Sequence, residues 1–158
     1  MDVDLREVSD ENRPQLLSIR IPPEQARFVG GQMDEVMADA ELFPDAKPWS
    51  RAVCVGEEVV GFVMISWDVE PDPPETIGPW FLWKLVIDER HQGRGLAGQV
   101  VRAIADIVAA EGATELLTSY VDEPGGPAPF YEKLGFVDTG DRDIEGEVIV
   151  KLDLQVPT

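Results

Sequence analysis

Cysteine and histidine each occur only once, at Cys54 and His91, in a chain of 158 residues. A lone cysteine excludes a disulfide framework within the chain. Cys54 lies in the apolar run "RAVCV", which favours a buried packing role over a nucleophilic one. One cysteine, one histidine and scattered acidic residues provide no ligand cluster of the kind that holds zinc, so we expect no metal site.

Basic residues are also scarce, because 13 lysines and arginines stand against 31 aspartates and glutamates, for a formal net charge of −18. That charge disfavours nucleic acid as a partner, since nucleic-acid binding needs clustered basic residues. The same charge attracts cationic partners, although acidity can equally serve only to keep a protein dissolved.

Long hydrophobic runs are missing. The longest apolar stretches, "VVGFVMI" and "WFLW", are far shorter than a helix that crosses a bilayer. The acidic N-terminus "MDVDLREVSDE" has no apolar core of the kind found in signal peptides. We therefore expect a cytoplasmic protein without a membrane partner.

A hydrophobic content of 44% is enough for a packed core, and the length suits a single domain over residues 1–158. Apolar runs predict strands at residues 3–8, 51–55, 58–69, 80–88, 114–121, 135–141 and 146–154. Helical spacing predicts helices at residues 11–19, 22–29, 32–42 and 126–134, and a long helix from residue 96 that ends before Gly112. Residues 43–50 and 70–79 are expected to form loops. This order predicts an α+β fold with a mostly antiparallel sheet of roughly six or seven strands and helices on both faces.

Three glycines lie within the segment "RHQGRGLAG" (residues 90–98), between a predicted strand and a predicted helix. Gly93, Gly95 and Gly98 match the G-x-G-x-x-G pattern of dinucleotide-binding folds. In those folds the glycines follow the strand directly, whereas "DERHQ" intervenes here, and the roughly sixty residues that follow are too few for a doubly wound sheet. The pattern therefore does not favour a dehydrogenase.

A second pattern in the same segment, Q-x-x-G-x-A from Gln92 to Ala97, fits the sequence better. Consecutive backbone N–H groups at the start of a helix can enclose an anion, and the partial positive charge of the helix end favours a pyrophosphate. Small residues at Gly93, Gly95 and Ala97 let phosphate oxygens approach the main chain. The alternative is a glycine-rich turn that only packs the helix onto the strand.

Two longer segments carry a family resemblance. The segment "LWKLVIDERHQGRGLAGQVVRAI" (residues 82–104) resembles the acetyl-CoA-binding core of the GNAT superfamily of N-acetyltransferases, and "PFYEKLGF" (residues 129–136) resembles its C-terminal signature. The order of predicted strands and helices is similar over nearly the whole chain. Within the superfamily, "FLWKLVIDERHQGRG", "TSY", "FYEKLGFVDTGD" and "GEVIVKLDL" together resemble bacterial spermine/spermidine (diamine) acetyltransferases.

The resemblance implies how acetyl-CoA is bound. In this superfamily the strand before the loop bulges and splays from its neighbour, and pantetheine enters the gap like an extra strand. Carried onto this chain, the contacts fall on Leu85, Val86, Ile87, Gln92, Gly93, Arg94, Gly95, Leu96 and Ala97. One N–H of the strand would polarise the acetyl carbonyl.

Charged residues of the same loop have smaller expected roles. Arg94 and Arg90 could both place charge near the phosphates. Arg94 is favoured because it lies inside the loop, and the alternative is a solvated surface arginine. His91 lies where the superfamily often has an aromatic or polar loop residue, so we do not expect it to be the catalytic base.

Tyr131 is the candidate catalytic side chain. It falls where the superfamily often has a tyrosine whose hydroxyl faces the CoA sulfur, which implies a general acid that protonates the leaving thiolate. The alternative is a tyrosine that only packs beside Phe130. Many relatives have asparagine seven residues earlier and alanine four residues earlier, where this chain has Pro124 and Pro127. That departure implies the loss of a CoA contact and a different entrance to the site.

The acceptor side is less defined. Polyamine acetyltransferases of the mammalian kind have a glutamate base where this chain has Trp83, so deprotonation falls to water, strand carbonyls or an unassigned carboxylate. The first helices and the loop before residue 80 flank the acetyl group in this fold, which gives as acceptor candidates Glu24, Phe28, Glu75, Trp80 and Trp83. Acids and aromatic rings suit a polycation, while the alternative for each is a surface charge or a core aromatic.

We therefore expect an acetyl-CoA-dependent N-acetyltransferase that transfers acetyl directly to a primary amine of a polyamine or diamine such as spermidine or spermine. Neither Cys54 nor the serines lie in a sequence pattern typical of an activated nucleophile, so we expect no covalent enzyme intermediate. The alternatives are an amine antibiotic or another small amine as acceptor, and a CoA-binding member without catalytic activity. The oligomeric state is left open, with a homodimer as one option.

Overall fold

Seven strands form one sheet in the computed structural model, which describes residues 2–154 apart from the side chains of Arg27 and Phe28. The strands are β1 (Asp4–Glu7), β2 (Pro48–Val55), β3 (Glu58–Ser66), β4 (Phe81–Ile87), β5 (Glu115–Tyr120), β6 (Val137–Arg142) and β7 (Val148–Asp153). Their order is β1-β2-β3-β4-β5-β7-β6, and among these strands only β4 and β5 pair in parallel. The predicted α+β class with a mostly antiparallel mixed sheet is confirmed.

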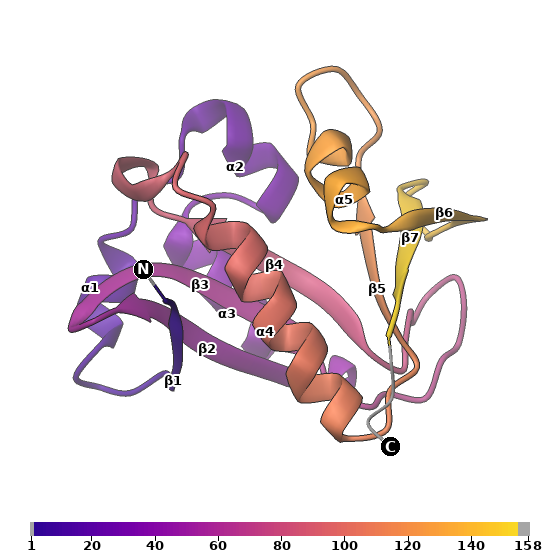
Figure 1. The fold of residues 1–158 in the computed structure, drawn as a ribbon, viewed down its shortest axis with the longest axis horizontal. Helices are drawn as coiled ribbons and strands as arrows, with labels where there is room; N and C mark the ends of the chain where they lie inside the picture. The colour runs from indigo at the N-terminus through magenta and orange to yellow at the C-terminus, as the bar shows by residue number, and fades with distance from the viewer. Residues whose placement is uncertain (1, 155–158) are drawn as a thin grey trace.

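Helices cover both faces of this sheet, as the sequence predicts. They are α1 (Arg13–Leu17), α2 (Pro23–Val29), α3 (Met33–Leu42), α4 (Leu96–Ala110) and α5 (Ala128–Leu134), with short 3-10 turns η1 (Pro44–Ala46) and η2 (Glu89–His91). Figure 1 shows α4 crossing one face, with α1 and α3 behind the opposite face. We call these the α4 face and the α1–α3 face. None of the helices in the described part of the chain is long and apolar enough to cross a membrane.

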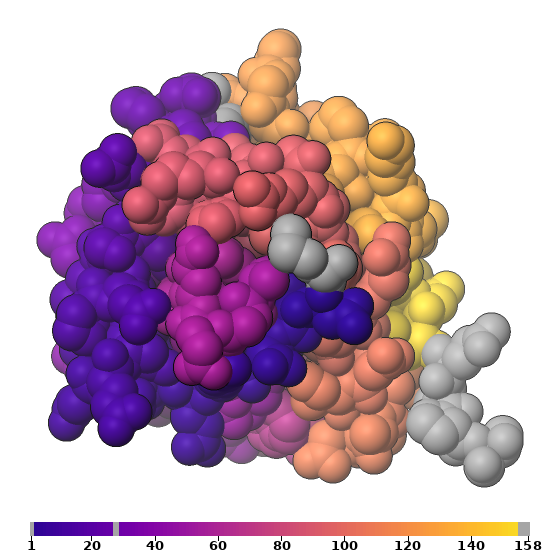
Figure 2. Space-filling view, turned by 60° about the vertical axis from the view of Figure 1, so that its left-hand side comes forward, coloured from indigo at the N-terminus to yellow at the C-terminus, as the bar shows by residue number. Residues whose placement is uncertain are grey.

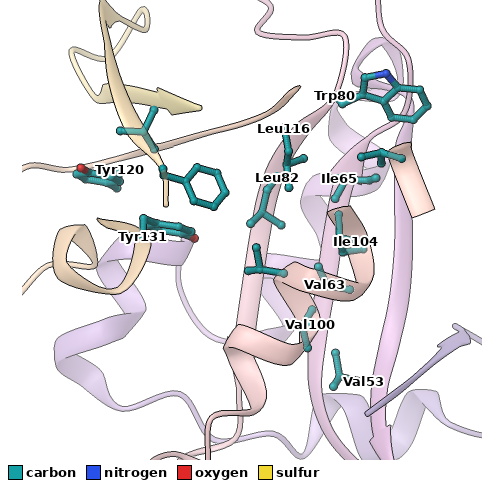
Figure 3. Packing of buried hydrophobic residues seen from close by; sticks show 14 of the residues in the cluster. Val53, Val63, Ile65, Trp80, Leu82, Val100, Ile104, Leu116, Tyr120 and Tyr131 are labelled. Carbon is teal, nitrogen blue, oxygen red and sulfur yellow. The ribbon is translucent and has the colours of Figure 1, made fainter. Parts of the chain in front are cut away.

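The core of the α4 face comes from the apolar stripe that the sequence shows between residues 96 and 108. Leu96 of α4 is buried in this core. Val100 and Ile104 of the same helix are buried against strand residues such as Val63 and Leu116 (Figure 3). Burying an aliphatic side chain of this kind contributes about 1.5–3 kcal/mol. This packing fixes the N-terminal end of α4 relative to the end of β4.

The α1–α3 face has its own core. Leu16 of α1 and Val36 of α3 are fully buried against Phe62 and Met64 of β3. Cys54 belongs to the same cluster and is 1% exposed. Burial raises the pKa of its thiol, so the expectation of an unreactive packing cysteine is confirmed.

The prediction of a loop over residues 43–50 is wrong in its last third. Pro48, Trp49 and Ser50 begin β2 and pair with the end of β3. Proline is tolerated as the first residue of a strand, because the missing N–H is not needed there. The strand predicted over residues 58–69 ends at Ser66.

The parallel pair β4 and β5 is short. Phe81 pairs with Leu117 and Leu82 pairs with Thr118, and no further pair follows. Figure 1 shows β5 and β7 turning away from β4 beyond this point, with α5 and the start of α4 on the two sides of the opening. We call the point where β4 and β5 separate, just beyond the Leu82–Thr118 pair, the divergence.

A β-bulge lies in β4 at the divergence. Leu82 is opposite Ile65 of β3 and Lys84 is opposite Met64, which leaves Trp83 as the extra residue. A bulge of this kind changes which side chains share a face. Trp83 packs toward the α1–α3 core, and Lys84 reaches α3 on the same face, so two consecutive side chains point the same way.

Candidate active site

The glycine segment after β4 takes backbone conformations that favour glycine. Gly93 has φ +82° and Gly95, the N-cap residue of α4, has φ +76°. A Cβ added at either position would meet no atom within 4 Å, so the space beside both residues is open. Open space beside a helix N-terminus is what an anion needs in order to reach the backbone N–H groups.

The buried carboxylate of Asp88 holds the start of this segment in place. Asp88 is completely buried and accepts hydrogen bonds from the Arg90 backbone N–H (2.9 Å), Nε (2.9 Å) and Nη2 (2.6 Å). These bonds to the Arg90 guanidinium lower the pKa of Asp88 to about 2. The structure therefore commits Arg90 to Asp88, which leaves Arg94 as the arginine that projects from the loop.

Arg94 and His91 lie next to each other on the loop. Arg94 is exposed, and its Nη1 lies 3.3 Å from His91 Nδ1. The other ring nitrogen of His91 lies 2.9 Å from a Glu58 carboxylate oxygen. Both ring nitrogens of His91 thus have neighbours, one in the loop and one in β3, and the expectation that His91 is not the base stays a prediction.

Gln92 connects the loop to two other elements. Its Nε2 donates to the Ile87 carbonyl at 2.9 Å and to the Gln25 side chain, also at 2.9 Å, and Gln25 donates back at 3.1 Å. Gln25 belongs to α2, so this amide pair ties α2 to the loop. In Figure 2 the salmon surface of the loop and first turn of α4 is bordered by the purple α2 region.

A cavity of about 380 Å³ opens between this loop and α5. Its lining is Gln25, Leu85, Ile87, His91, Gln92, Gly93, Gly95, Leu96, Ala97, Gly98, Pro127, Phe130 and Tyr131. Seven of the nine residues that the family resemblance assigns to acetyl-CoA binding are in this set, and Val86 and Arg94 are not. The structure thus brings the end of β4, the glycine segment and the α5 tyrosine to one cavity.

The main chain of β4 presents free groups to this cavity. The Asp88 N–H donates to the Val60 carbonyl of β3, so by alternation Leu85 and Ile87 direct their backbone groups away from β3, into the divergence. The Ile87 carbonyl accepts from Gln92 on that side. The edge beside Leu85 is where an extended ligand could add as a strand.

Val86 is placed differently from the expectation. By the same alternation its backbone groups face β3, and its side chain is buried in the core of the α1–α3 face. Only alternate residues of a strand present their main chain to one side. We therefore keep Leu85 and Ile87, but not Val86, as candidate main-chain contacts of a ligand in the divergence.

Tyr131 reaches the divergence from the α4 face. It is 8% exposed, and its ring packs among Tyr120, Phe130 and Phe136. Burial raises the pKa of its phenol to about 12, and a hydrogen bond with the Thr118 hydroxyl acts in the opposite direction. Thr118 in turn donates to the Leu82 carbonyl at 2.8 Å. The phenol is therefore protonated at neutral pH and positioned beside the last β4–β5 pair.

The proline-rich entrance to α5 contributes directly to the cavity. Pro127 is the N-cap residue of α5 and lines the cavity together with Phe130. The substitution of proline at this position therefore shapes the wall of the cavity next to Tyr131.

On the α1–α3 face the divergence carries charged and aromatic side chains. Trp83 makes an edge contact with Phe43, with ring centroids 5.7 Å apart. Lys84 is buried, with its Nζ 2.9 Å from Asp39 and 2.6 Å from the Val29 carbonyl at the end of α2. Through this ion pair and this hydrogen bond, Lys84 connects α3 and α2 to the bulge of β4.

The other acceptor candidates lie elsewhere. Trp80 is 6% exposed and packs against Trp67, at the far end of the core from Tyr131 (Figure 3). Glu24 on α2 and Glu75 in the 67–80 loop are exposed, and neither lines the cavity. Phe28 lies in α2, but its side chain is outside the described residues. The structure therefore brings Trp83, but not Trp80, to the divergence.

Sequence reasoning missed several side chains near the divergence. Gln25 is an ordinary polar residue with no local pattern that marks it, and Thr118 and Ser119 lie in the segment "TSY", which carries the family resemblance but gave neither residue a role. Lys84 did carry a signal, since it is the only charge within "WFLWKLVI", and a lone charge in a buried strand needs a partner. The partner, Asp39, lies 45 residues earlier and could not be identified from spacing.

These features together fit acetyl-CoA. The N-terminal end of the 15-residue helix α4 and the open space at Gly93 and Gly95 suit a pyrophosphate. The free main-chain edge beside Leu85, which lines the cavity, suits the pantetheine amides. Among the described residues there is no cluster of three or more metal-ligating side chains.

Comparison with known proteins agrees with this geometry. The model of the acetyltransferase (GNAT) family matches residues 13–136. The spermine/spermidine N(1)-acetyltransferase of Bacillus subtilis (strain 168) is 25% identical over 155 residues, which cover 98% of this chain and 100% of that protein.

Solved structures share the fold. An acetyltransferase from Thermus thermophilus superposes with a TM-score of 0.72 at 22% identity and covers 98% of each chain. The PaiA N-acetyltransferase from Thermoplasma acidophilum, solved in complex with coenzyme A, superposes with a TM-score of 0.65 at 12% identity and covers 97% of this chain and 99% of its own. The protein therefore belongs to the GNAT acetyltransferase family, as an N-acetyltransferase that uses acetyl-CoA.

Proposed function

We propose that this enzyme transfers the acetyl group of acetyl-CoA to a primary amine of a small polycation of the polyamine or diamine class. The observation that carries the proposal is the combination of carboxylates and aromatic rings on the α1–α3 face of the divergence. Phe43 offers an aromatic ring there, beside Trp83, whose ring centroid lies 5.6 Å from Lys84 Nζ. Glu147 offers a carboxylate, with the carboxylates of Asp143 and Glu145 beside it in the β6–β7 turn. Cationic amines are attracted to both kinds of group.

The overall charge supports the same class of acceptor. A formal net charge of −18 raises the local concentration of polycations around the protein and speeds their association. The nearby Lys84 does not oppose this attraction strongly, because its ammonium is paired with Asp39. The relative from Bacillus subtilis that matches over its whole length is named for spermine and spermidine.

The donor side of the mechanism is assigned to the main chain. Acetyl-CoA supplies an activated acetyl thioester. The N–H groups at the start of α4 would hold its phosphates, with Gln92, Gly93, Arg94, Gly95, Leu96 and Ala97 forming the loop around them. Leu85 and Ile87 would pair with the pantetheine arm, and a β4 N–H directed into the divergence would polarise the acetyl carbonyl.

Tyr131 is assigned the general-acid role on the α4 face. Its phenol stays protonated near neutral pH because burial raises its pKa to about 12. A protonated phenol beside the Leu82–Thr118 pair can donate to a departing thiolate. Direct transfer of acetyl to the amine is part of the proposal, and the burial of Cys54 supports it by removing the one thiol of the chain as an acetyl carrier.

The proposal is tested by a thiol-release assay with acetyl-CoA and a panel of amines. The panel contains spermine, spermidine, a short diamine, butylamine, an aminoglycoside and a neutral aromatic amine. We expect spermine or spermidine to give the highest kcat/KM, at least ten times that of butylamine. A higher kcat/KM for the aminoglycoside would replace the polyamine by an amine antibiotic. Release of no thiol with any amine, in a protein that binds acetyl-CoA, would identify an inactive CoA-binding member.

A further inference from the structure

The residues just beyond the last β4–β5 pair are Trp83 on β4 and Ser119 on β5. Thr118 directs its hydroxyl toward Leu82 and Tyr131 on the α4 face. Because successive side chains of a strand alternate, Ser119 points to the α1–α3 face. Ser119 therefore stands on the opposite side of the divergence from the Tyr131 phenol.

Glu147 is held against Ser119 from the neighbouring strand. It lies directly before β7, where Val148 and Val150 pack into the core of the α4 face, so Glu147 points to the α1–α3 face. The Ser119 hydroxyl donates to Glu147 Oε1 at 3.4 Å. The side chain is half-buried, so it is neither fully solvated nor sealed in the core.

The backbone around Glu147 is fixed by the turn between β6 and β7. The Glu147 N–H donates to Asp143 Oδ1 at 2.9 Å, and the Asp143 N–H donates to the Glu147 carbonyl at 3.1 Å. Asp143 Oδ1 also accepts from the Glu145 N–H at 2.9 Å. These bonds hold the start of β7, and hence the Glu147 carboxylate, next to β5.

We propose that Glu147 is the general base, which binds the acceptor ammonium on the α1–α3 face of the divergence and takes its proton before acetyl transfer. Trp83 stands where polyamine acetyltransferases of the mammalian kind have a glutamate base, and its indole does not accept a proton at neutral pH. Glu147 would supply the missing base. The proposal requires N-acetyltransferase activity toward a primary amine, but not a polyamine acceptor.

The ionisation of Glu147 fits this role. Burial, together with repulsion from Asp143 and Glu145 of its own hairpin, raises its pKa to about 7, while the Ser119 hydroxyl on β5 acts in the opposite direction. A carboxylate with a pKa near the working pH is an effective base, because a large fraction is ionised and each ion holds a proton more strongly than an ordinary glutamate.

The proton and electron balance is simple. The amine gives one proton to Glu147, which releases it to solvent. The freed nitrogen lone pair forms the bond to the acetyl carbon, and the carbon–sulfur electron pair leaves with sulfur. The nitrogen loses a second proton as the amide forms, and the sulfur gains one proton from Tyr131, so the number of protons lost and gained in the transfer is the same. A base and an acid on opposite faces of one divergence thus serve the two ends of the reaction.

The test compares Glu147→Gln with the control Glu111→Gln, which removes an exposed carboxylate at the C-terminal end of α4, away from the β6–β7 turn. Both are assayed with spermine and with butylamine from pH 6 to pH 10. We expect Glu147→Gln to lower kcat/KM for both amines roughly 100-fold near pH 7, within the usual range for a general base. The deficit should shrink toward pH 10, where the amines lose the proton unaided. Glu147→Asp should recover part of the activity.

A purely structural role for Glu147 predicts a deficit that does not change with pH. Acetyl-CoA affinity, measured by calorimetry, should be the same in both variants and in the wild type. A folded Glu147→Gln protein with wild-type kcat/KM, or with a deficit constant in pH, would overturn the proposal, as would a wild type that acetylates neither amine. If butylamine is acetylated as well as spermine while the pH-dependent deficit persists, the base stands and the polyamine acceptor is rejected.

Discussion

On the α4 face, the site beside the divergence between β4 and β5 is built largely from strand main chain and a glycine loop, with Phe130 and Tyr131 added from α5, whereas on the α1–α3 face the divergence carries carboxylates, Lys84 and aromatic side chains. The residues of β4, the glycine loop and the start of α4 that line the cavity lie within a single segment, residues 85–98. The side chains on the other face come from α3, β4, β5 and the β6–β7 turn.

This difference matches the two ligands that an acetyltransferase must bind. A phosphate or an extended amide chain can be bound by main-chain groups, so its site needs particular backbone conformations more than particular side chains. An amine has no comparable main-chain partner and must be recognised by acids and rings. Changes at the glycines should therefore affect acetyl-CoA, and changes on the α1–α3 face should affect the acceptor.

The largest expected effect is the loss of acetyl-CoA binding in Gly95→Val. The branched side chain would enter the open space of the cavity, and φ +76° is unfavourable for valine. Gly112→Val is the matched control, because Gly112 also has positive φ (+96°) and open space but does not line the cavity. Both variants should lose about 1–2 kcal/mol of stability.

Calorimetry with acetyl-CoA and thermal melts separate the two variants. We expect Gly112→Val to keep the wild-type affinity and the wild-type rise in Tm on addition of acetyl-CoA, and Gly95→Val to lose both. Unchanged affinity in folded Gly95→Val would mean that the glycine segment only packs the helix onto the strand.

Tyr131→Phe should lower kcat by about 10²-fold, the low end of the range for a general acid, because a CoA thiolate is a fairly good leaving group. The phenylalanine ring keeps the packing against Phe130 and Phe136, so acetyl-CoA affinity should change little. Tyr120→Phe is the control, since Tyr120 stacks on Tyr131 at 5.8 Å without lining the cavity. Equal kcat in Tyr131→Phe and wild type would remove Tyr131 from the mechanism.

The same comparison explains how much the sequence could predict. The α4 stripe and the glycine segment depend on residues close together in the chain, so local spacing identified the helix from Leu96 and the loop residues from Gln92 to Ala97, while the family resemblance added Leu85, Ile87 and Tyr131. The assignment of Val86 is wrong because three consecutive residues of a strand cannot all direct their main chain to one side. Which alternate set faces the divergence depends on the bulge at Trp83, which local spacing does not reveal.

The acceptor face depends on contacts that are distant in sequence. Glu147 reaches Ser119 only because β7 pairs with β5 in one register, with Ile149 opposite Ser119. A shift by one residue would send Glu147 to the other face. Trp80 shows the opposite case, where an aromatic residue near the expected site belongs to the core.

Asp88→Asn should destabilise the protein by about 2 kcal/mol at pH 7, because the native carboxylate has a pKa of about 2, below its ordinary 3.8. A lowered native pKa contributes stability above the unfolded-state pKa, and that contribution is lost as the pH falls from about 4 to about 2. The gap between the wild type and the variant in urea unfolding should therefore close in that window. The exposed Asp106→Asn should show no gap, and a gap that is constant with pH would contradict the ion pair with Arg90.

The smallest expected effect is that of salt on the two substrates. An increase from about 0.05 to about 0.5 M NaCl shortens the screening length several-fold, and exposed charge attraction weakens accordingly. A polycation that approaches a surface of net charge −18 should lose more from this screening than acetyl-CoA, whose proposed contacts are largely backbone groups at α4. We expect KM for spermine to rise roughly three- to tenfold, and KM for butylamine and for acetyl-CoA to rise less than twofold. The measurement is steady-state kinetics at constant pH. Equal salt dependence for spermine and butylamine would show that the acidic surface plays no part in the choice of acceptor, and the preference for a polycation would then have to come from contacts with Glu147, Phe43 and Trp83 at the divergence.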